Sequence, residues 1–240
     1  MGEDNQSLPL KKSELKTLNR LELIKLIEEL DSKYRQSVQE FEHLKAQLEI
    51  NELVLDTQKK MVEDALGEIH ELSITDHLTK LYNRRYFNDI FNKELRRAIR
   101  EQSYITLGIF DVDNFKSYND NYGHQKGDDA LLAIGDLLRE SLKRPSDYAF
   151  RLGGEEFGVL VCGLDATESY SFCEHLRVEI EELKLLHEYN DASSYVSVSF
   201  GVASTLPSLD TTLTYLYNQA DKAMYQSKAE GKNRTTLVEI

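Results

Sequence analysis

Apolar residues recur at every seventh position along the first third of the chain. From Ile27 to Ile69 all seven positions of this series are apolar, and four of the seven positions three residues further on are also apolar. Because the segment contains no proline, this heptad pattern predicts a coiled-coil helix. At about 1.5 Å per residue, residues 27–75 would form a rod of roughly 70 Å. The two series are Ile27, Tyr34, Phe41, Leu48, Leu55, Val62 and Ile69, and Leu30, Ser37, Leu44, Asn51, Gln58, Ala65 and Leu72.

The narrow apolar stripe predicts that this helix pairs with a second helix, most simply in a parallel homodimer. A single amphipathic helix packed on its own domain is the alternative. Ser37, Asn51 and Gln58 interrupt the seam, either as an adjustment of solubility or because two registers of nearly equal energy let the stalk switch. Residues 1–26 carry leucines out of phase with the later heptads, and we expect a separate short helical segment there.

From residue 85 onward the periodicity changes, and helices alternate with short apolar strands. Such an order predicts an α/β (α+β) domain with a central mixed sheet covered by helices. The expected helices cover residues 85–100, 129–142, 166–188 and 212–229, the expected strands cover 104–111, 195–203 and 235–239, and a β-hairpin covers 148–162.

Two glycines and two acids stand together at the tip of the expected hairpin. Gly153 and Gly154 permit positive φ and leave room for a bulky anionic ligand near the backbone. Glu155 and Glu156 follow directly, and adjacent carboxylates repel one another unless a cation lies between them. Oxygen ligands for a hard cation such as Mg²⁺ are therefore one explanation, and an ordinary acidic turn is the other.

A second acidic segment, Asp111-Val112-Asp113, follows an apolar strand. Burial of carboxylates at such a point is unfavourable unless a cation compensates, so these acids are further candidates for metal binding. The polar residues 114–128 come next and lead into a helix whose N-terminus would favour an anion.

Together these residues resemble the GGDEF-domain diguanylate cyclases, in the GGEEF version in which Glu155 replaces the more usual Asp. The resemblance implies a palm fold like that of polymerases and adenylate cyclases over residues 76–240, which follows the coiled-coil dimerisation stalk that the heptads predict over 27–75. It also implies condensation of two GTP molecules into cyclic di-GMP and two pyrophosphates. The matching residues, between about 73 and 240, are Asp76 to Thr79, Leu81, Asn83 to Arg85, Phe110 to Asp113, Phe115, Lys116, Asn119, Asp120, Gly123, His124, Gly127, Asp128, Gly153 to Phe157, Ser199 to Ala203, Ala220, Asp221, Ala223 to Tyr225, Lys228 and Gly231 to Arg234.

The resemblance assigns the metal and the reacting groups. It implies that Asp111, the Val112 carbonyl and Glu155 hold Mg²⁺, with Mn²⁺ as an alternative. Glu156 is a second ligand or a general base, and Lys116 neutralises charge on the reacting phosphates.

The resemblance also assigns residues to GTP. Lys228 and Lys232 match the positions that bind the β- and γ-phosphates, and because position 232 is often Arg, we expect Lys there to weaken binding without abolishing activity. Asn119 and Asp128 match the guanine-selecting positions, since a carboxylate accepts well from the guanine N1 and exocyclic amine. A turn or helix cap is the alternative for Asn119, an N-cap for Asp128. His124 belongs either to the nucleotide pocket or to a structural loop.

Arg144 and Asp147 form an Arg-x-x-Asp pattern, with five residues between Asp147 and the signature glycines, and resemble the site at which cyclic di-GMP inhibits such enzymes. Arg can pair with phosphate or guanine, and Asp can accept from guanine. A surface ion pair is the alternative.

Because each domain would hold one GTP, catalysis would need two domains face to face, and the stalk would supply the homodimer.

Composition limits the remaining classes of function. The net charge is −13 and the pI about 5.0, which argues against a nucleic-acid surface. The sequence contains no run of 18 apolar residues, so we expect neither a signal peptide nor a membrane span. The two cysteines, Cys162 and Cys173, lack metal-site spacing and suit core thiols in a reducing cytoplasm. Two alternatives remain: a silent GGDEF module that acts as a cyclic di-GMP receptor, and a coiled-coil adaptor. Residues 1–70 show no recognisable sensor domain, which is compatible with a fragment of a longer protein, and the sequence does not reveal the upstream signal.

Overall fold

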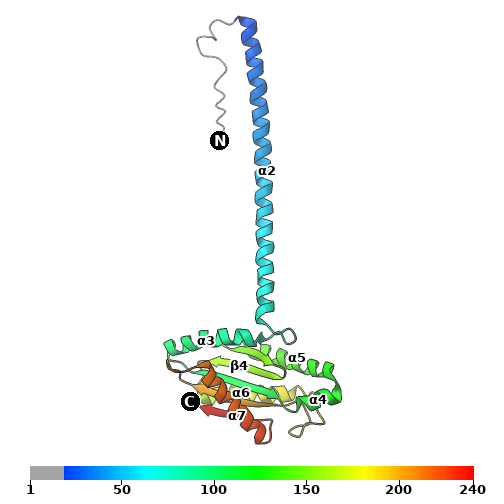
Figure 1. The fold of residues 1–240 in the computed structure, drawn as a ribbon, viewed down its shortest axis with the longest axis vertical. Helices are drawn as coiled ribbons and strands as arrows, with labels where there is room; N and C mark the ends of the chain where they lie inside the picture. Colours follow the sequence, from blue (N-terminus) through cyan, green and yellow to red (C-terminus); the bar gives the residue numbers. More distant parts are fainter. Residues whose placement is uncertain (1–18) are drawn as a thin grey trace. The chain divides into compact units, whose positions relative to one another are not determined.

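The computed structural model describes residues 19–240, and the chain divides into two compact units with the boundary after Gly67. Helix α2 (Arg20–Ile74) is a single helix of 55 residues, as Figure 1 shows. This confirms the long helix that the heptads predict. The first-series residues are exposed along it, with Ile27 at 64%, Phe41 at 69% and Leu55 at 65%. The short segment predicted over residues 1–26 lies mostly outside the described residues, and from Arg20 it is continuous with α2.

The second unit contains a six-stranded mixed sheet, which confirms the predicted fold class. The strand order is β1-β3-β4-β2-β5-β6, with β2 at the centre between two antiparallel neighbours. The pairs β1–β3 and β5–β6 are parallel. The strands are β1 (Tyr82–Asn83), β2 (Ile105–Val112), β3 (Tyr148–Gly153), β4 (Glu156–Cys162), β5 (Val198–Thr205) and β6 (Thr235–Glu239).

Five helices of this unit flank the sheet and bury its two faces (Figure 1). Alternation along β2 divides the core: Ile105, Leu107 and Ile109 join one apolar cluster with α3 and α7, whereas Phe110 and Val112 join another with α5 and α6. The helices are α3 (Arg84–Glu101), α4 (Phe115–Tyr122), α5 (His124–Ser141), α6 (Ala166–Glu182) and α7 (Leu213–Ala229).

One helix is missing from the prediction, and three predicted elements have wrong bounds. The polar segment after β2 contains the helix α4, and α5 begins at His124, five residues before the predicted start. Helix α6 ends at Glu182 instead of residue 188 because Lys184 is left-handed, with φ of 52°, and Leu186 pairs with Tyr195 in an isolated bridge. Strand β5 covers Val198–Thr205 instead of 195–203.

Helix α7 lies against the backbone of β5 at Gly201. A Cβ atom at this position would collide with the carbonyl oxygen of Ala220 and the backbone nitrogen of Met224. The absence of a side chain therefore allows the helix and the strand to approach one another directly.

Cys173 is fully buried in the opposite layer, and Cys162 is half-buried and unbridged, as expected for core thiols. Among residues 19–240 no helix is long and apolar enough to cross a membrane.

Candidate active site

One edge of the sheet brings the predicted metal ligands together. Asp111, near the end of β2, lies opposite Glu156 on β4 and opposite Ser199 on β5. The Val112 amide donates to the carbonyl of Glu155 across a distance of 3.4 Å. Because β2 runs antiparallel to β4, the end of β2 and the β3–β4 turn necessarily meet at this edge. Strand pairing thus explains why acids more than 40 positions apart are neighbours.

Arg151 holds the two-glycine turn of this edge. Gly153 has φ of 154° and Gly154 has φ of 53°, and the Arg151 guanidinium donates from Nε and Nη2 to the Gly154 carbonyl at 2.9 and 2.8 Å. Its Nη1 donates to Asp76 at 2.9 Å, and these two side chains are only 12% and 17% exposed. Asp76 also accepts from the amide and hydroxyl of Thr79, both at 2.9 Å. We had not singled out Arg151, although an arginine two positions before a glycine turn is a usable signal.

A lysine from α7 neutralises the central carboxylate. Lys228 Nζ lies 2.6 Å from Asp111 Oδ1, and the two side chains are 33% and 14% exposed. Burial raises the pKa of Asp111 to about 6; Lys228 opposes the rise, while the negative charges of Glu155 and Glu156 add to it. The acids of this edge are therefore close enough to repel, and the edge favours a bound cation.

Asp113, the residue directly after β2, is held by hydrogen bonds within the fold. It is 1% exposed and accepts from the hydroxyls of Ser197 at 2.7 Å and Ser199 at 2.6 Å, and from the Asn233 amide at 3.1 Å. These bonds join the end of β2 to the start of β5 and to the turn before β6. Our interpretation of both acids as candidates for metal binding is therefore wrong for Asp113, and Asp111 alone lies at the open edge.

Helix α4 carries two of the predicted substrate residues. Lys116 is exposed in its first turn. Asn119 lies inside the helix, and its buried Oδ1 accepts no hydrogen bond from the described residues. A Cβ at Gly127, on α5, would collide with this oxygen, so the glycine leaves the amide its space. An unpaired buried amide oxygen is the group that a guanine donor would satisfy.

The first turns of α5 display His124 and Asp128, both exposed. The N-cap of α5 is Gly123, with φ of 85°, so the alternative of Asp128 as an N-cap is wrong. Asn119 does not cap a helix through its side chain either, although its carbonyl accepts from the Gly123 amide at 2.9 Å. Both side chains remain available to a ligand.

Lys232 lies in the turn between α7 and β6, with φ of 60°. Its Nζ is 2.7 and 2.8 Å from the two carboxylate oxygens of Asp191, in the loop between α6 and β5. Asp191 also accepts from Asn114 Nδ2 at 2.9 Å. Sequence reasoning missed Asp191, because an isolated acid in a polar loop carries no pattern.

Arg144 and Asp147 lie together in the turn before β3, at the opposite end of that strand from the two-glycine turn. The Asp147 amide donates to the Arg144 carbonyl at 3.1 Å, and Arg144 is exposed. Asp147 Oδ1 is buried and accepts no hydrogen bond from the described residues, and burial raises the pKa of this carboxyl while Arg144 opposes the rise. A cavity of about 670 Å³ adjoins it, lined also by Lys80, Arg139 and Tyr148.

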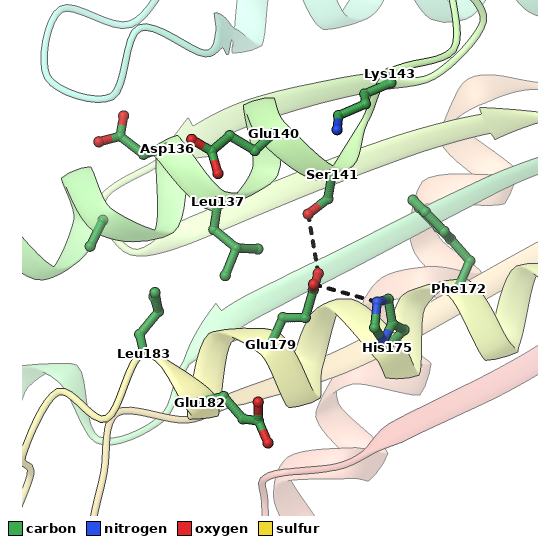
Figure 2. Close-up of a pocket in the computed structure, with 11 residues that line it drawn as sticks. Asp136, Leu137, Glu140, Ser141, Lys143, Phe172, His175, Glu179, Glu182 and Leu183 are labelled. Atoms are coloured by element: carbon green, nitrogen blue, oxygen red, sulfur yellow. Dashed lines mark hydrogen bonds and ion pairs between the residues drawn. The ribbon is translucent and has the colours of Figure 1, made fainter.

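A second hollow, of about 740 Å³, lies between α5 and α6 and contains none of the predicted site residues (Figure 2). Glu179 projects between the helices there, accepts from the Ser141 hydroxyl at 3.1 Å and lies 3.4 Å from His175 Nε2. Leu137 and Phe172 contribute its apolar surface. Cavity volume alone therefore does not identify the functional site of this fold.

The acidic edge fits Mg²⁺ in its donor chemistry. Within residues 19–240 no three or more His, Cys, Asp or Glu side chains converge as a complete metal cage. Mg²⁺ does not require one, because it is commonly bound by one or two carboxylates together with substrate phosphates and water. Asp111, the Val112 carbonyl, Glu155 and Glu156 all offer oxygen ligands. The pKa of Asp111 is raised mainly by burial, with a further contribution from Glu155 and Glu156, and a bound cation would oppose both effects.

The chain is similar to known proteins of one family. Residues 73–234 match the family described as "Diguanylate cyclase, GGDEF domain". The diguanylate cyclase DgcS of Shewanella oneidensis is 37% identical over 166 residues, which are 69% of this chain and 53% of that protein. The chain thus spans about half the length of that relative.

Two crystal structures are similar over more than the sheet and its helices. The coiled coil and GGDEF domain of DgcB from Caulobacter crescentus, in complex with c-di-GMP, matches with a TM-score of 0.71 at 28% identity, covering 80% of this chain and 99% of that chain. The diguanylate cyclase SiaD in complex with its activator SiaC, from Pseudomonas aeruginosa, matches with a TM-score of 0.62 at 30% identity, covering 94% and 87%.

Proposed function

Because the chain belongs to the GGDEF-domain family of diguanylate cyclases, we propose that it condenses two GTP molecules into cyclic di-GMP with release of two pyrophosphates. The observation that carries the proposal is the acidic edge, where Asp111 lies opposite Glu156 and is neutralised by Lys228. A GGDEF module that acts only as a receptor would not need this set of charged groups.

Each chain would activate one GTP and present it to the other. When bound by Asp111, the Val112 carbonyl and Glu155, Mg²⁺ would lower the pKa of the attacking 3′-hydroxyl and absorb charge on the phosphates. Lys228 leaves Asp111 and contacts the phosphates, so that the same ammonium stabilises the empty and the occupied site. Glu156 accepts a proton or completes the ligand set.

Residues of α4, of α5 and of the turn after α7 select and hold the nucleotide. Asn119 Oδ1 and the Asp128 carboxylate accept from the guanine N1 and exocyclic amine, a donor pair that adenine lacks. Lys116 and Lys232 neutralise phosphate charge, and His124 lines the base pocket.

A homodimer through α2 would bring the two half-sites together. The apolar heptad residues of α2 are exposed along the single chain, which is the condition for pairing with a second copy. Tethering would raise the effective concentration of one half-site for the other to about millimolar. The matching DgcB structure, which contains a coiled coil and a GGDEF domain, supports this arrangement.

We further propose that cyclic di-GMP inhibits the enzyme at Arg144 and Asp147. The buried, unpaired Asp147 Oδ1 beside a cavity of about 670 Å³ offers an acceptor for a guanine donor. Arg144→Ala should relieve product inhibition without changing the initial rate in product-free enzyme. An unchanged response to added cyclic di-GMP would contradict this assignment.

The first experiment incubates the full chain with GTP and Mg²⁺ and separates the nucleotides by chromatography and mass. Bound product is stripped beforehand, and the dimer is verified by light scattering. We expect cyclic di-GMP from the unmodified chain and none from Glu155→Ala, while Glu182→Ala, a control in the hollow between α5 and α6, retains activity. Intact GTP from stripped, dimeric protein would reject the cyclase and leave the receptor.

Control of the stalk by a partner protein is a second proposal. The SiaD structure contains the activator SiaC, and its similarity to this chain extends over 94% of the chain. The proposal would be supported if the isolated chain turns over GTP slowly and a co-purified partner raises this rate. Full turnover of the chain alone would count against it.

A further inference from the structure

Both lysines assigned to the triphosphate are held by carboxylates of the chain itself. Lys228 contacts Asp111, which already belongs to the proposed metal site. Lys232 contacts Asp191, which belongs to no assigned site and comes from the loop between α6 and β5. The Lys232 side chain is 25% exposed and that of Asp191 is 68% exposed, so the acid covers the lysine from the solvent side.

Asp191 makes this contact with both oxygens and with a third residue. Its Oδ1 and Oδ2 lie 2.7 and 2.8 Å from Lys232 Nζ, and Oδ1 accepts from Asn114 Nδ2 at 2.9 Å. Asn114 is the left-handed N-cap of α4, two positions before Lys116. Asp191 therefore lies between the two elements that carry the proposed phosphate-binding lysines.

The charge of Asp191 is maintained by these contacts. The hydrogen bond from Lys232 contributes most to lowering the pKa of Asp191; burial opposes this effect, and the bond from Asn114 adds to it. A carboxylate with two oxygens on one ammonium occupies the position that two phosphate oxygens would take.

We propose that Asp191 acts as an internal substitute for a substrate phosphate on Lys232, and so limits the affinity of the empty site for GTP. The inference rests on the proposed function, because it takes the ligand of Lys232 to be a triphosphate. An incoming phosphate must displace the Asp191 carboxylate or lie beside a like charge. Since exposed ion pairs are weak, we expect the Asp191 charge to lower the affinity of the site for GTP by about three- to fivefold relative to a site without that charge.

The decisive variant is Asp191→Asn, which keeps the size of the side chain and an oxygen that can accept from Asn114, but removes the charge. We expect it to bind GTP about three- to fivefold more tightly and to lower KM by the same factor, with kcat changed less than about twofold. The gain should vanish in a Lys232→Ala background. Glu101→Gln, which removes one charge from an exposed pair with Arg97 on α3, serves as the matched control.

Binding is measured calorimetrically on the full chain with Mg²⁺ and a GTP analogue that carries a methylene group between the α- and β-phosphates, so that it cannot be condensed. GMP is the second probe, because it lacks the phosphates assigned to Lys232. Tighter binding of the triphosphate analogue but not of GMP supports the proposal. Equal or weaker binding by Asp191→Asn, the same gain with GMP, or the same gain in Glu101→Gln overturns it.

The outcome is separable from that of the proposed function. Failure of the unmodified chain to make cyclic di-GMP would reject the cyclase, whereas the comparison of analogue and GMP would still decide whether Asp191 competes for Lys232.

Discussion

Replacing Arg151 with methionine should both destabilise the chain and slow turnover, because one guanidinium joins Asp76 to the turn that carries Glu155. The substitution removes both guanidinium donors from the Gly154 carbonyl, and because this contact is exposed, we take its loss as about 1 kcal/mol. It also leaves Asp76, 17% exposed, without its cation. Breaking a fully buried pair costs about 3–5 kcal/mol, and since Thr79 still donates twice to Asp76, we take about 1–2 kcal/mol here.

The expected loss of unfolding free energy is therefore about 2–3 kcal/mol, which corresponds to a Tm lower by roughly 5–10 °C for a domain of this size. Urea unfolding followed by circular dichroism, at one fixed protein concentration, measures it on the full chain. Turnover with saturating GTP at 20 °C, where the variant remains folded, should fall about tenfold because the turn is no longer fixed.

Arg100→Met is the matched control, since Arg100 on the same unit is 71% exposed and should contribute below about 1 kcal/mol. The double variant with Asp76→Asn tests the coupling. If Arg151→Met costs less than about 1 kcal/mol, or if the two substitutions are additive within about 0.5 kcal/mol, the interpretation of this contact is refuted.

Three further predictions concern other parts of the chain. Burial raises the pKa of Asp76, but the hydrogen bonds from Thr79 and Arg151 outweigh it and lower this pKa below its ordinary value of 3.8. The contribution of Asp76 to stability is therefore present above about pH 4 and is lost as the pH falls further. In urea unfolding measured between pH 3 and 7, the destabilisation caused by Arg151→Met should shrink toward the acidic end. Gly127→Ala should raise KM for GTP several-fold with less effect on kcat, since a Cβ displaces the Asn119 amide; unchanged KM in steady-state assays would contradict the assignment of that amide. Inserting one residue within 73–75 rotates the following chain by about 100° and should change turnover strongly, whereas seven residues restore the phase within about 20°; equal turnover in both would exclude control by the stalk.

Most of the sheet and its covering helices could be predicted, because their signals are local. Strands β2 and β4 are mostly apolar runs, and the acids Asp111 and Glu156 stand at the ends where the two strands meet. The long helix followed from its heptads for the same reason.

The missed features depend on contacts between distant residues. Helix α4 has eight mostly polar residues, and its Phe115 and Tyr118 gain their stability by packing into a core that sequence periodicity does not reveal. The apolar residues that follow Glu182 continue the helical pattern of the sequence, but the left-handed backbone of Lys184 ends the helix there. Asp113 resembles a metal ligand until its three donors are known.

The contact at Gly201 has a consequence for how the molecule opens. Strand β5 is buried along its whole length, and α7 touches it backbone to backbone, so the two should exchange their amide hydrogens only in a shared, nearly global unfolding event. Lys228, on α7, belongs to this slowest-opening part. The two-glycine turn and the loop of Asp191 lie outside it, so adjustment to an arriving nucleotide falls to them, and hydrogen exchange with and without ligand should change there first.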